Sequence, residues 1–176
     1  MIQIILSRHC QTELLASGDP GAKRNDSSPS ELGLKQAKEM AEFVKKYDYE
    51  AMFTSLFVRA IKTGEIINEE RKLPIFSNIS LSEYFTGDDG KGRESVDMGI
   101  SRTMSYLYNF FGIYNSIAIV GHKSINSTIL RSILNMDFEE AESYFKSPGE
   151  TLVLRRDWKA GDKTWHIVEK FMPSQQ

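Results

Sequence analysis

The sequence predicts an α/β fold, specifically a three-layer α/β/α sandwich with a mostly parallel central sheet. Short apolar runs at residues 2–7, 49–55 and 117–121 are separated by longer segments with helical periodicity. This alternation is typical of a parallel sheet whose two faces are covered by helices. The run at residues 2–7 is also apolar almost throughout, which indicates a strand buried on both faces.

After this first strand the chain predicts a loop, a helix, a second strand and a second helix. Residues 18–30 are rich in Gly, Pro, Asn, Asp and Ser and predict the loop. Ser30 can cap the following helix, which should end near Tyr47 and bury Leu34, Ala37, Ala41 and Val44. Beyond the strand at residues 49–55, residues 56–71 predict a helix with inward-facing Val58, Ile61 and Ile66.

The next segment predicts a third strand at residues 74–81 and an exposed, glycine-rich loop at residues 84–99. An aromatic-rich helix at residues 100–111 then leads to the fourth strand. Residues 124–136 predict a helix that buries Ile125, Ile129 and Ile133. A further helix should begin after Asp137, its expected cap.

The chain closes with a predicted hairpin. Residues 150–158 and 164–171 form its strands, and residues 160–162 carry the turn signal Ala-Gly-Asp. No repeat, linker or compositional break is visible, and 40% apolar residues suffice for a sizeable core. We therefore expect a single domain over residues 1–176.

Composition and charge limit the classes of partner. The formal charge is −2 without acidic or basic blocks, so we expect no nucleic acid and no membrane surface as partner. A small molecule is the better expectation, and no partner protein is indicated. Cys10 is the one cysteine, which excludes an intramolecular disulfide, and the N-terminal strand lacks the pattern of a signal peptide. These features favour a cytoplasmic protein.

Five chemically active side chains follow the ends of the predicted strands. Arg8 and His9 follow the first strand, and Arg59 lies in the first turn of the helix after the second. Glu83 follows the third strand and His122 the fourth. Ligands bind to open parallel sheets at the carboxyl ends of the strands. We therefore expect one cleft, with the two imidazoles within about 8 Å so that both can reach one bound group.

This cluster suits a phosphoryl dianion. Arg8 and Arg59 carry forked donors that match phosphate oxygens, and a neutral imidazole can attack phosphorus as a nucleophile. The nearby arginines favour neutral His9. The third histidine, His166, is expected on the surface of the terminal hairpin.

Five segments, in order along nearly the whole chain, resemble the motifs of the histidine phosphatase superfamily, which includes cofactor-dependent phosphoglycerate mutases, fructose-2,6-bisphosphatases and α-ribazole phosphatases. Residues 8–12 (RHCQT) resemble its Arg-His-Gly-Glu/Gln-Thr signature, and residues 30–37 (SELGLKQA) its Leu-Thr-x-x-Gly-x-x-Gln-Ala helix start. Residues 54–63 (TSLFVRAIKT) resemble its Ser-x-Leu-x-Arg-Ala-x-x-Thr segment. Residues 81–83 (LSE) and 120–122 (VGH) resemble its acid and second-histidine motifs. The resemblance implies one histidine phosphatase-like domain with a phosphoglycerate mutase-like fold.

The resemblance also implies a role for each group. His9 would be the nucleophile that becomes phosphohistidine. Arg8, Arg59 and His122 would hold the phosphoryl oxygens, and Glu83 would protonate the leaving oxygen. The implied activity is hydrolysis of a phosphomonoester on a small phosphorylated substrate, with no cofactor.

Two residues beside the histidines depart from the family pattern. Cys10 and Lys123 stand where glycines are usual. One branch of the family has an aspartate, its acid, directly after the second histidine; Lys123 occupies that position here, so Glu83 is the better acid. We place Lys123 among the substrate-binding residues. The departures keep open an alternative, a catalytically weakened or inactive homologue that binds a phosphorylated ligand and acts through a partner.

Two further alternatives are a metal site and a mutase. His9, His122 and Glu83 are a two-histidine, one-carboxylate set, but the adjacent arginines would repel a divalent cation. Phosphoglycerate mutase-type phosphoryl transfer needs a closing lid over a dry site. About 33 residues separate Glu83 from the fourth strand, and a loop and a helix already occupy them, so we favour hydrolysis. The sequence names no particular substrate.

Overall fold

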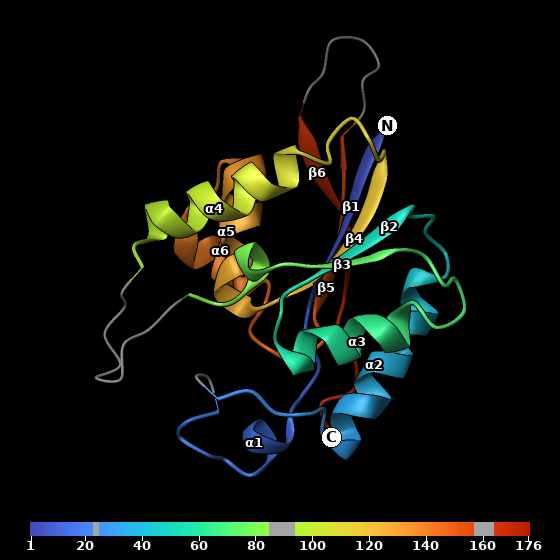
Figure 1. Ribbon diagram of the computed structural model, residues 1–176, viewed down its shortest axis with the longest axis vertical. Coiled ribbons are helices and arrows are strands. Elements are labelled where there is room, and N and C mark those ends of the chain that lie inside the picture. Colours follow the sequence, from blue (N-terminus) through green and yellow to red (C-terminus); the bar gives the residue numbers. More distant parts are fainter. Residues whose placement is uncertain (23–24, 85–93, 157–163) are drawn as a thin grey trace.

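The computed structural model describes residues 1–22, 25–84, 94–156 and 164–176 (Figure 1). In chain order the elements are β1 (Ile2–Arg8), α1 (Glu13–Ala16), α2 (Glu31–Val44), β2 (Ala51–Thr54), α3 (Val58–Ile67), β3 (Ile75–Ser77), the 3₁₀ helix η1 (Ile79–Leu81), α4 (Val96–Tyr108), β4 (Ser116–Gly121), α5 (Lys123–Leu134), α6 (Phe138–Ser143), β5 (Thr151–Arg156) and β6 (Trp165–Phe171). Among these helices, none has both the length and the apolar character needed to cross a membrane.

The strands form one six-stranded sheet in the order β3-β2-β4-β1-β5-β6. β1 and β2 both pair in parallel with β4, and β2 also pairs in parallel with β3. β5 runs antiparallel to both β1 and β6. The mostly parallel sheet and the terminal hairpin are therefore confirmed. The turn predicted at residues 160–162 lies outside the described residues.

Helices cover both faces of this sheet, which confirms the three-layer arrangement (Figure 1). α2 and α3 pack together on one face, while α4, α5 and α6 pack on the other. Each face has its own buried core. The α2–α3 side contains Ile5, Met40, Met52, Ala60 and Val120. The opposite side contains Leu6, Phe53, Leu107, Ile129 and Phe145.

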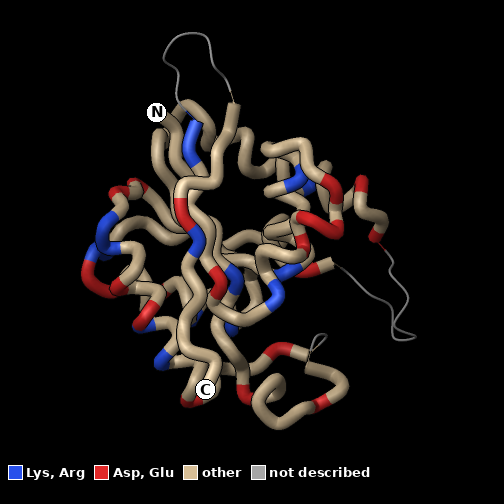
Figure 2. The backbone as a smooth tube through the Cα atoms, turned by 180° about the vertical axis from the view of Figure 1, so that it is seen from behind, with Lys and Arg blue, Asp and Glu red and all other residues tan. Residues whose placement is uncertain are grey.

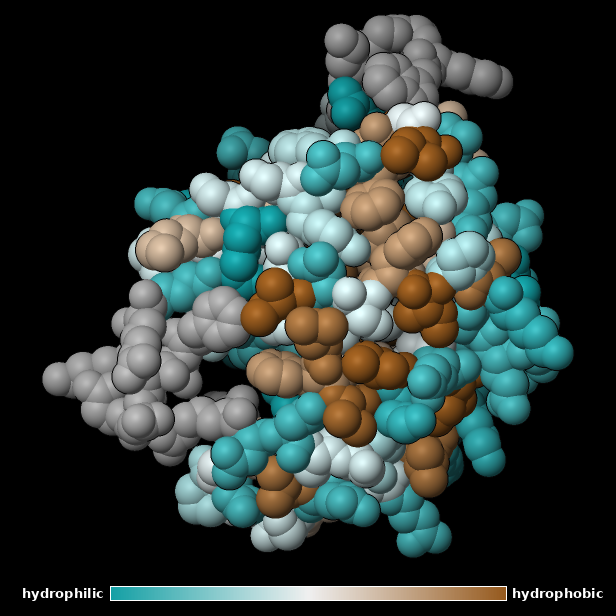
Figure 3. Space-filling view, viewed as in Figure 1, coloured by the Kyte–Doolittle hydropathy of each residue, from teal (hydrophilic) through white to brown (hydrophobic). Residues whose placement is uncertain are grey.

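The predicted inward faces of two helices are partly wrong. In α2, Leu34 is exposed, and the buried residues are Gly33, Gln36, Ala37, Met40, Phe43 and Val44. In α3, Val58 is exposed, and the buried residues are Arg59, Ala60, Thr63, Gly64 and Ile67. Figure 3 shows apolar side chains on the surface over the region of α3 and β3. The spacing of apolar residues did not identify the whole buried face, because both helices also bury polar side chains: Gln36 in α2, and Arg59 and Thr63 in α3.

Two other boundaries differ from the sequence prediction. β3 ends at Ser77, because the Asn78 side chain accepts a hydrogen bond from the Ser80 N–H at 2.8 Å and starts η1. α4 begins at Val96, inside the predicted loop, with Ser95 as its cap. Residues 85–93 of that loop lie outside the described residues.

Other predictions are confirmed. Ser30 and Asp137 cap α2 and α6 through their side chains, Ile125 and Ile129 are fully buried, and His166 is exposed on β6. Acidic and basic residues are interspersed along the described backbone rather than gathered by sign (Figure 2).

Candidate active site

The register of the parallel strands brings the two predicted histidines together. Arg8 in β1 is paired with Gly121 in β4, so the residues that follow them, His9 and His122, leave the sheet side by side. The His9 N–H donates to the Gly121 carbonyl at 3.0 Å. The imidazole centroids are 5.1 Å apart, well inside the limit of about 8 Å for sharing one bound group.

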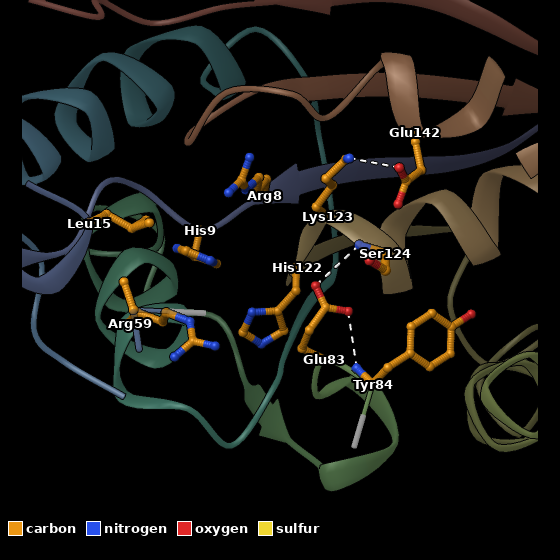
Figure 4. Close-up of a pocket in the computed structure, with 11 residues that line it drawn as sticks. Arg8, His9, Leu15, Arg59, Glu83, Tyr84, His122, Lys123, Ser124 and Glu142 are labelled. Carbon is orange, nitrogen blue, oxygen red and sulfur yellow. Dashed lines mark hydrogen bonds and ion pairs between the residues drawn. The ribbon is translucent and has the colours of Figure 1, made fainter. Parts of the chain in front are cut away.

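One cavity of about 360 Å³ is lined by all six predicted site residues (Figure 4). These are Arg8, His9, Arg59, Glu83, His122 and Lys123. Sequence reasoning did not include its other lining residues, which are Leu15, Ala22, Tyr84, Ser124 and Glu142. A cavity of this volume suits a small-molecule ligand.

The tautomer of His9 follows from its contact with the backbone. Its Nδ1 lies 2.8 Å from the Cys10 carbonyl oxygen. Because a carbonyl oxygen only accepts hydrogen bonds, Nδ1 carries the proton and Nε2 keeps a free lone pair. Burial holds the pKa of His9 well below its ordinary value, with smaller contributions from Arg8 and Arg59. The predicted neutral form is correct in direction, but burial contributes more than the arginines.

His122 is held by a hydroxyl that sequence reasoning did not single out. Its Nε2 lies 2.7 Å from Ser55 Oγ, which also accepts the Phe57 N–H at 3.0 Å. Nδ1 is buried with no hydrogen-bond partner among the described residues. Burial, followed by the nearby His9, lowers the pKa of His122 well below its ordinary value. Ser55 directly follows β2, which pairs with β4. Its position at the end of a predicted strand is the sequence feature that could have identified it.

Arg59 is positioned by the loop before α2. Its side chain is only 3% exposed, and Nη1 lies 3.2 Å from both Asp26 Oδ1 and the Asn25 carbonyl oxygen. The Asp26 carboxylate also accepts the Val58 N–H, and so caps α3, whose own cap residue, Phe57, has no side-chain acceptor. The start of α3 has no polar cap residue of its own. That absence is the sequence feature that could have indicated a capping carboxylate such as Asp26 elsewhere in the chain.

Arg8 is oriented by main-chain oxygens. Its Nη1 donates to the Phe145 carbonyl at 3.0 Å and to the Lys146 carbonyl at 2.7 Å. Its Nε is buried with no hydrogen-bond partner among the described residues. A buried guanidinium donor of this kind is costly unless a ligand oxygen accepts it.

Glu83 lies on the opposite side of His122 from His9 in the view of Figure 4. Its two carboxyl oxygens accept the Tyr84 N–H at 3.1 Å and the Ser124 N–H at 3.2 Å. Burial raises the pKa of Glu83, and these two hydrogen bonds oppose the change. The direction of this change is the one that an acid near neutral pH requires.

Lys123, the first residue of α5, makes an ion pair across the cavity wall. Its Nζ lies 2.7 Å from Glu142 Oε2 of α6. No motif in the sequence pointed to Glu142, because α6 enters the site only through its packing against α5.

Cys10 is fully buried behind the site. Its N–H donates to Thr63 Oγ1 at 3.2 Å, and its Sγ lies 3.1 Å from the same hydroxyl. Burial raises the pKa of the Cys10 thiol, so the thiol is a packing group rather than a nucleophile. The described residues contain no group of three or more His, Cys, Asp or Glu side chains that could hold a metal ion.

Comparison with known proteins assigns the family. The model of the histidine phosphatase superfamily (branch 1) matches residues 4–103, which include most of β1, all of α2 and α3, and Glu83. The chain belongs to the histidine phosphatase superfamily. A curated relative, the uncharacterized phosphatase PhoE of Bacillus subtilis, is 34% identical over 88 residues. That alignment covers 50% of this chain and 45% of PhoE, so it spans less than half of the relative's length.

Solved structures show the same fold along nearly the whole chain of this family member. A mycobacterial glucosyl-3-phosphoglycerate phosphatase in complex with VO3 has a TM-score of 0.80 at 17% identity, covering 96% of this chain and 98% of its own. The α-ribazole phosphatase of Shigella flexneri has a TM-score of 0.79 at 16% identity, covering 94% of each chain. The phosphoglycerate mutase-like fold implied by the motifs is therefore correct.

Proposed function

We propose that this histidine phosphatase family member hydrolyses small phosphomonoesters through a phosphohistidine intermediate on His9. One observation carries the proposal: His9 is a buried, neutral imidazole whose Nδ1 proton is held by the Cys10 carbonyl. The free Nε2 lone pair of such an imidazole is the nucleophile. It lies in a cavity that also contains two guanidinium groups and a second imidazole.

In the first step, His9 Nε2 attacks phosphorus and the ester P–O bond breaks. Glu83, whose pKa burial raises, gives its proton in this step to the departing oxygen, so that an alcohol leaves. Arg8, Arg59 and His122 stabilise the charge on the phosphoryl oxygens. The Nδ1 hydrogen bond to Cys10 stabilises the positive charge that the phosphorylated ring acquires.

In the second step, water attacks the phosphohistidine. Glu83, now a carboxylate, accepts a proton from this water, the N–P bond breaks, and inorganic phosphate leaves. His9 returns to its neutral form. Both half-reactions therefore use the same groups, with Glu83 acting first as acid and then as base.

The test is trapping of the phosphoenzyme. A labelled phosphoester mixed with the protein and quenched should leave an acid-labile, base-stable label, and His9→Ala should abolish both the label and turnover. His166→Ala, which changes an exposed histidine on β6, is the matched control and should retain both. A label that persists in His9→Ala would refute the assignment.

Two alternatives are separated by further assays. A homologue that only binds phosphorylated ligands would not hydrolyse p-nitrophenyl phosphate at a rate above the His9→Ala background. A mutase would convert 3-phosphoglycerate, primed with bisphosphoglycerate, to 2-phosphoglycerate faster than it releases phosphate. We expect phosphate release to dominate.

We further propose that residues 1–176 act as one catalytic domain and that the protein works in the cytoplasm. The coverage of 96% and 98% in the structural comparison supports the single domain. The single cysteine, a buried free thiol, fits a reducing compartment. Mass spectrometry of thiols and cell fractionation test the location.

A further inference from the structure

We propose that the cavity selects phosphomonoesters whose leaving group is uncharged and carries hydroxyls, and disfavours those with a second anionic group. This inference rests on the proposed hydrolase function and concerns the space beyond the phosphoryl group. The Lys123–Glu142 ion pair carries it.

The ion pair faces the space that a leaving group would occupy. Lys123 follows His122 directly, and both Lys123 and Glu142 line the cavity. Figure 4 shows the pair on the side of the cavity opposite Leu15. The two side chains are 36% and 28% exposed and 2.7 Å apart. They are therefore reachable by a ligand while already satisfying each other.

The charged residues that line the cavity fall into two sets. Arg8 and Arg59 supply two positive charges beside His9, which matches a phosphoryl dianion. Asp26, which pairs with Arg59, does not line the cavity. The positive charge of Lys123 is cancelled by Glu142. Glu83, the remaining charged lining residue, adds no charge when it carries the proton that the proposed mechanism requires of it. Among the described lining residues, then, the net positive charge is used by the phosphoryl group and none is left for a second anion.

A substrate carboxylate beside Lys123 would meet Glu142 as well. It would have to separate the existing pair, leaving a partly buried carboxylate without its partner, or remain beside a like charge. A hydroxyl requires neither. Lys123 has further N–H donors and Glu142 further lone pairs, so the intact pair can donate to one hydroxyl and accept from its neighbour.

The opposite wall suits the carbon skeleton of the same leaving group. Leu15 lies on that side in Figure 4 and presents apolar surface to the cavity, and Ala22 is a further apolar lining residue. A polyol or sugar has this dual character, with hydroxyls on one side of a C–H surface. The geometry thus points to alcohol or sugar monophosphates rather than phosphorylated acids or bisphosphates.

The experiment compares two substrates that differ at one carbon. Glycerol 3-phosphate has a hydroxymethyl group where 3-phosphoglycerate has a carboxylate. Wild-type kcat/KM should favour glycerol 3-phosphate by about tenfold or more at low ionic strength, the ratio that about 1.4 kcal/mol of binding difference gives. Added salt should reduce the preference, because the pair is partly exposed.

Glu142→Gln tests the cause of the preference. It keeps the shape of the side chain but leaves the Lys123 charge uncompensated. The kcat/KM ratio should then shift toward 3-phosphoglycerate by roughly tenfold. Glu139→Gln, the same charge change at an exposed position of α6 outside the cavity, should leave the ratio unchanged.

The outcomes separate this inference from the proposed function. Hydrolysis of both esters with 3-phosphoglycerate preferred by wild type would overturn the inference alone. An equal ratio in the Glu142→Gln and Glu139→Gln variants would also overturn it. Failure of wild type to hydrolyse even p-nitrophenyl phosphate would overturn the proposed function and the inference with it.

Discussion

Lowering the pH from about 7.5 to about 5.0 should destabilise the folded protein through the two buried histidines of the site. His9 and His122 are 5% and 1% exposed, and burial holds the pKa of each well below its ordinary value. Below about pH 6.5 the unfolded chain binds protons that the folded chain refuses. Above that pH both states are neutral at these histidines, and the free energy of unfolding is unaffected by them. As the pH falls below it, the free energy of unfolding decreases.

The size of the loss follows from the linkage relation. At pH 5.0 the unfolded imidazole lies about 1.5 pH units below its pKa, which corresponds to about 2 kcal/mol for each histidine that stays neutral in the fold. The two together give about 4 kcal/mol. Glu83 acts in the opposite direction, because its pKa is raised and the folded state holds the proton that the unfolded state has released. We therefore expect a net loss of about 2 to 4 kcal/mol, a large part of a typical domain stability of about 5–15 kcal/mol.

Urea denaturation at the two pH values, followed by circular dichroism, measures this loss. His9→Asn and His122→Asn should each reduce the pH-dependent loss by about 2 kcal/mol, while Glu83→Gln should increase it. His166→Asn on the exposed face of β6 controls for the substitution itself. If the two site variants lose as much stability on acidification as wild type, the histidines are not buried as neutral groups, and the assignment of His9 as a ready nucleophile fails with them.

Three further predictions concern single side chains. Arg59→Lys should lower kcat/KM by roughly 10- to 100-fold, because lysine replaces the forked guanidinium donors with a point charge. Arg155→Lys on β5 is the control, and equal kcat/KM values in the two variants would contradict the binding of the phosphoryl group by Arg59. Glu83→Gln should lower the turnover of alkyl phosphates by roughly 10² to 10⁴ but lower the turnover of p-nitrophenyl phosphate much less, because nitrophenolate leaves without a proton. An equal decrease for both substrates would contradict the role of Glu83 as acid. Gly33→Ala should lower the free energy of unfolding by about 1–3 kcal/mol in urea denaturation, because the added Cβ would clash with the Gln11 carbonyl oxygen; unchanged stability would show that the segment after His9 can shift.

The parts of the site that the sequence predicts are those fixed by the parallel strands. A strand buried on both faces is recognisable from its apolar run, and its carboxyl end is then defined within a residue or two. His9 and His122 follow two such strands that are sheet neighbours. Arg59 is equally predictable because it lies in the first turn of α3, the helix that follows β2.

Helix faces are predicted less well, for a physical reason. The apolar stripe identifies the inward face only when the interior contacted is apolar. α3 instead turns Arg59 and Thr63 toward the site, and Thr63 binds the backbone of Cys10. Val58 is consequently exposed, although its apolar character suggested burial. In a helix beside a polar site, the buried face therefore does not coincide with the face on which apolar residues recur.

The partners of the charged groups could not be predicted, because they come from segments outside the motifs. Asp26 pairs with Arg59 across 33 positions of sequence, and Glu142 pairs with Lys123 across 19. Asp26 lies in the predicted loop and Glu142 in a predicted helix, but neither pattern identifies the side chain with which the carboxylate pairs. In the proposed reaction the two pairs have different consequences. Asp26 holds the Arg59 guanidinium that would bind the phosphoryl group, whereas Glu142 neutralises the Lys123 charge beside the proposed leaving-group space. Under the proposed function, the motifs account for binding of the phosphoryl group, whereas the proposed selectivity for the leaving group depends on the packing of α6 against α5, which the motifs do not encode.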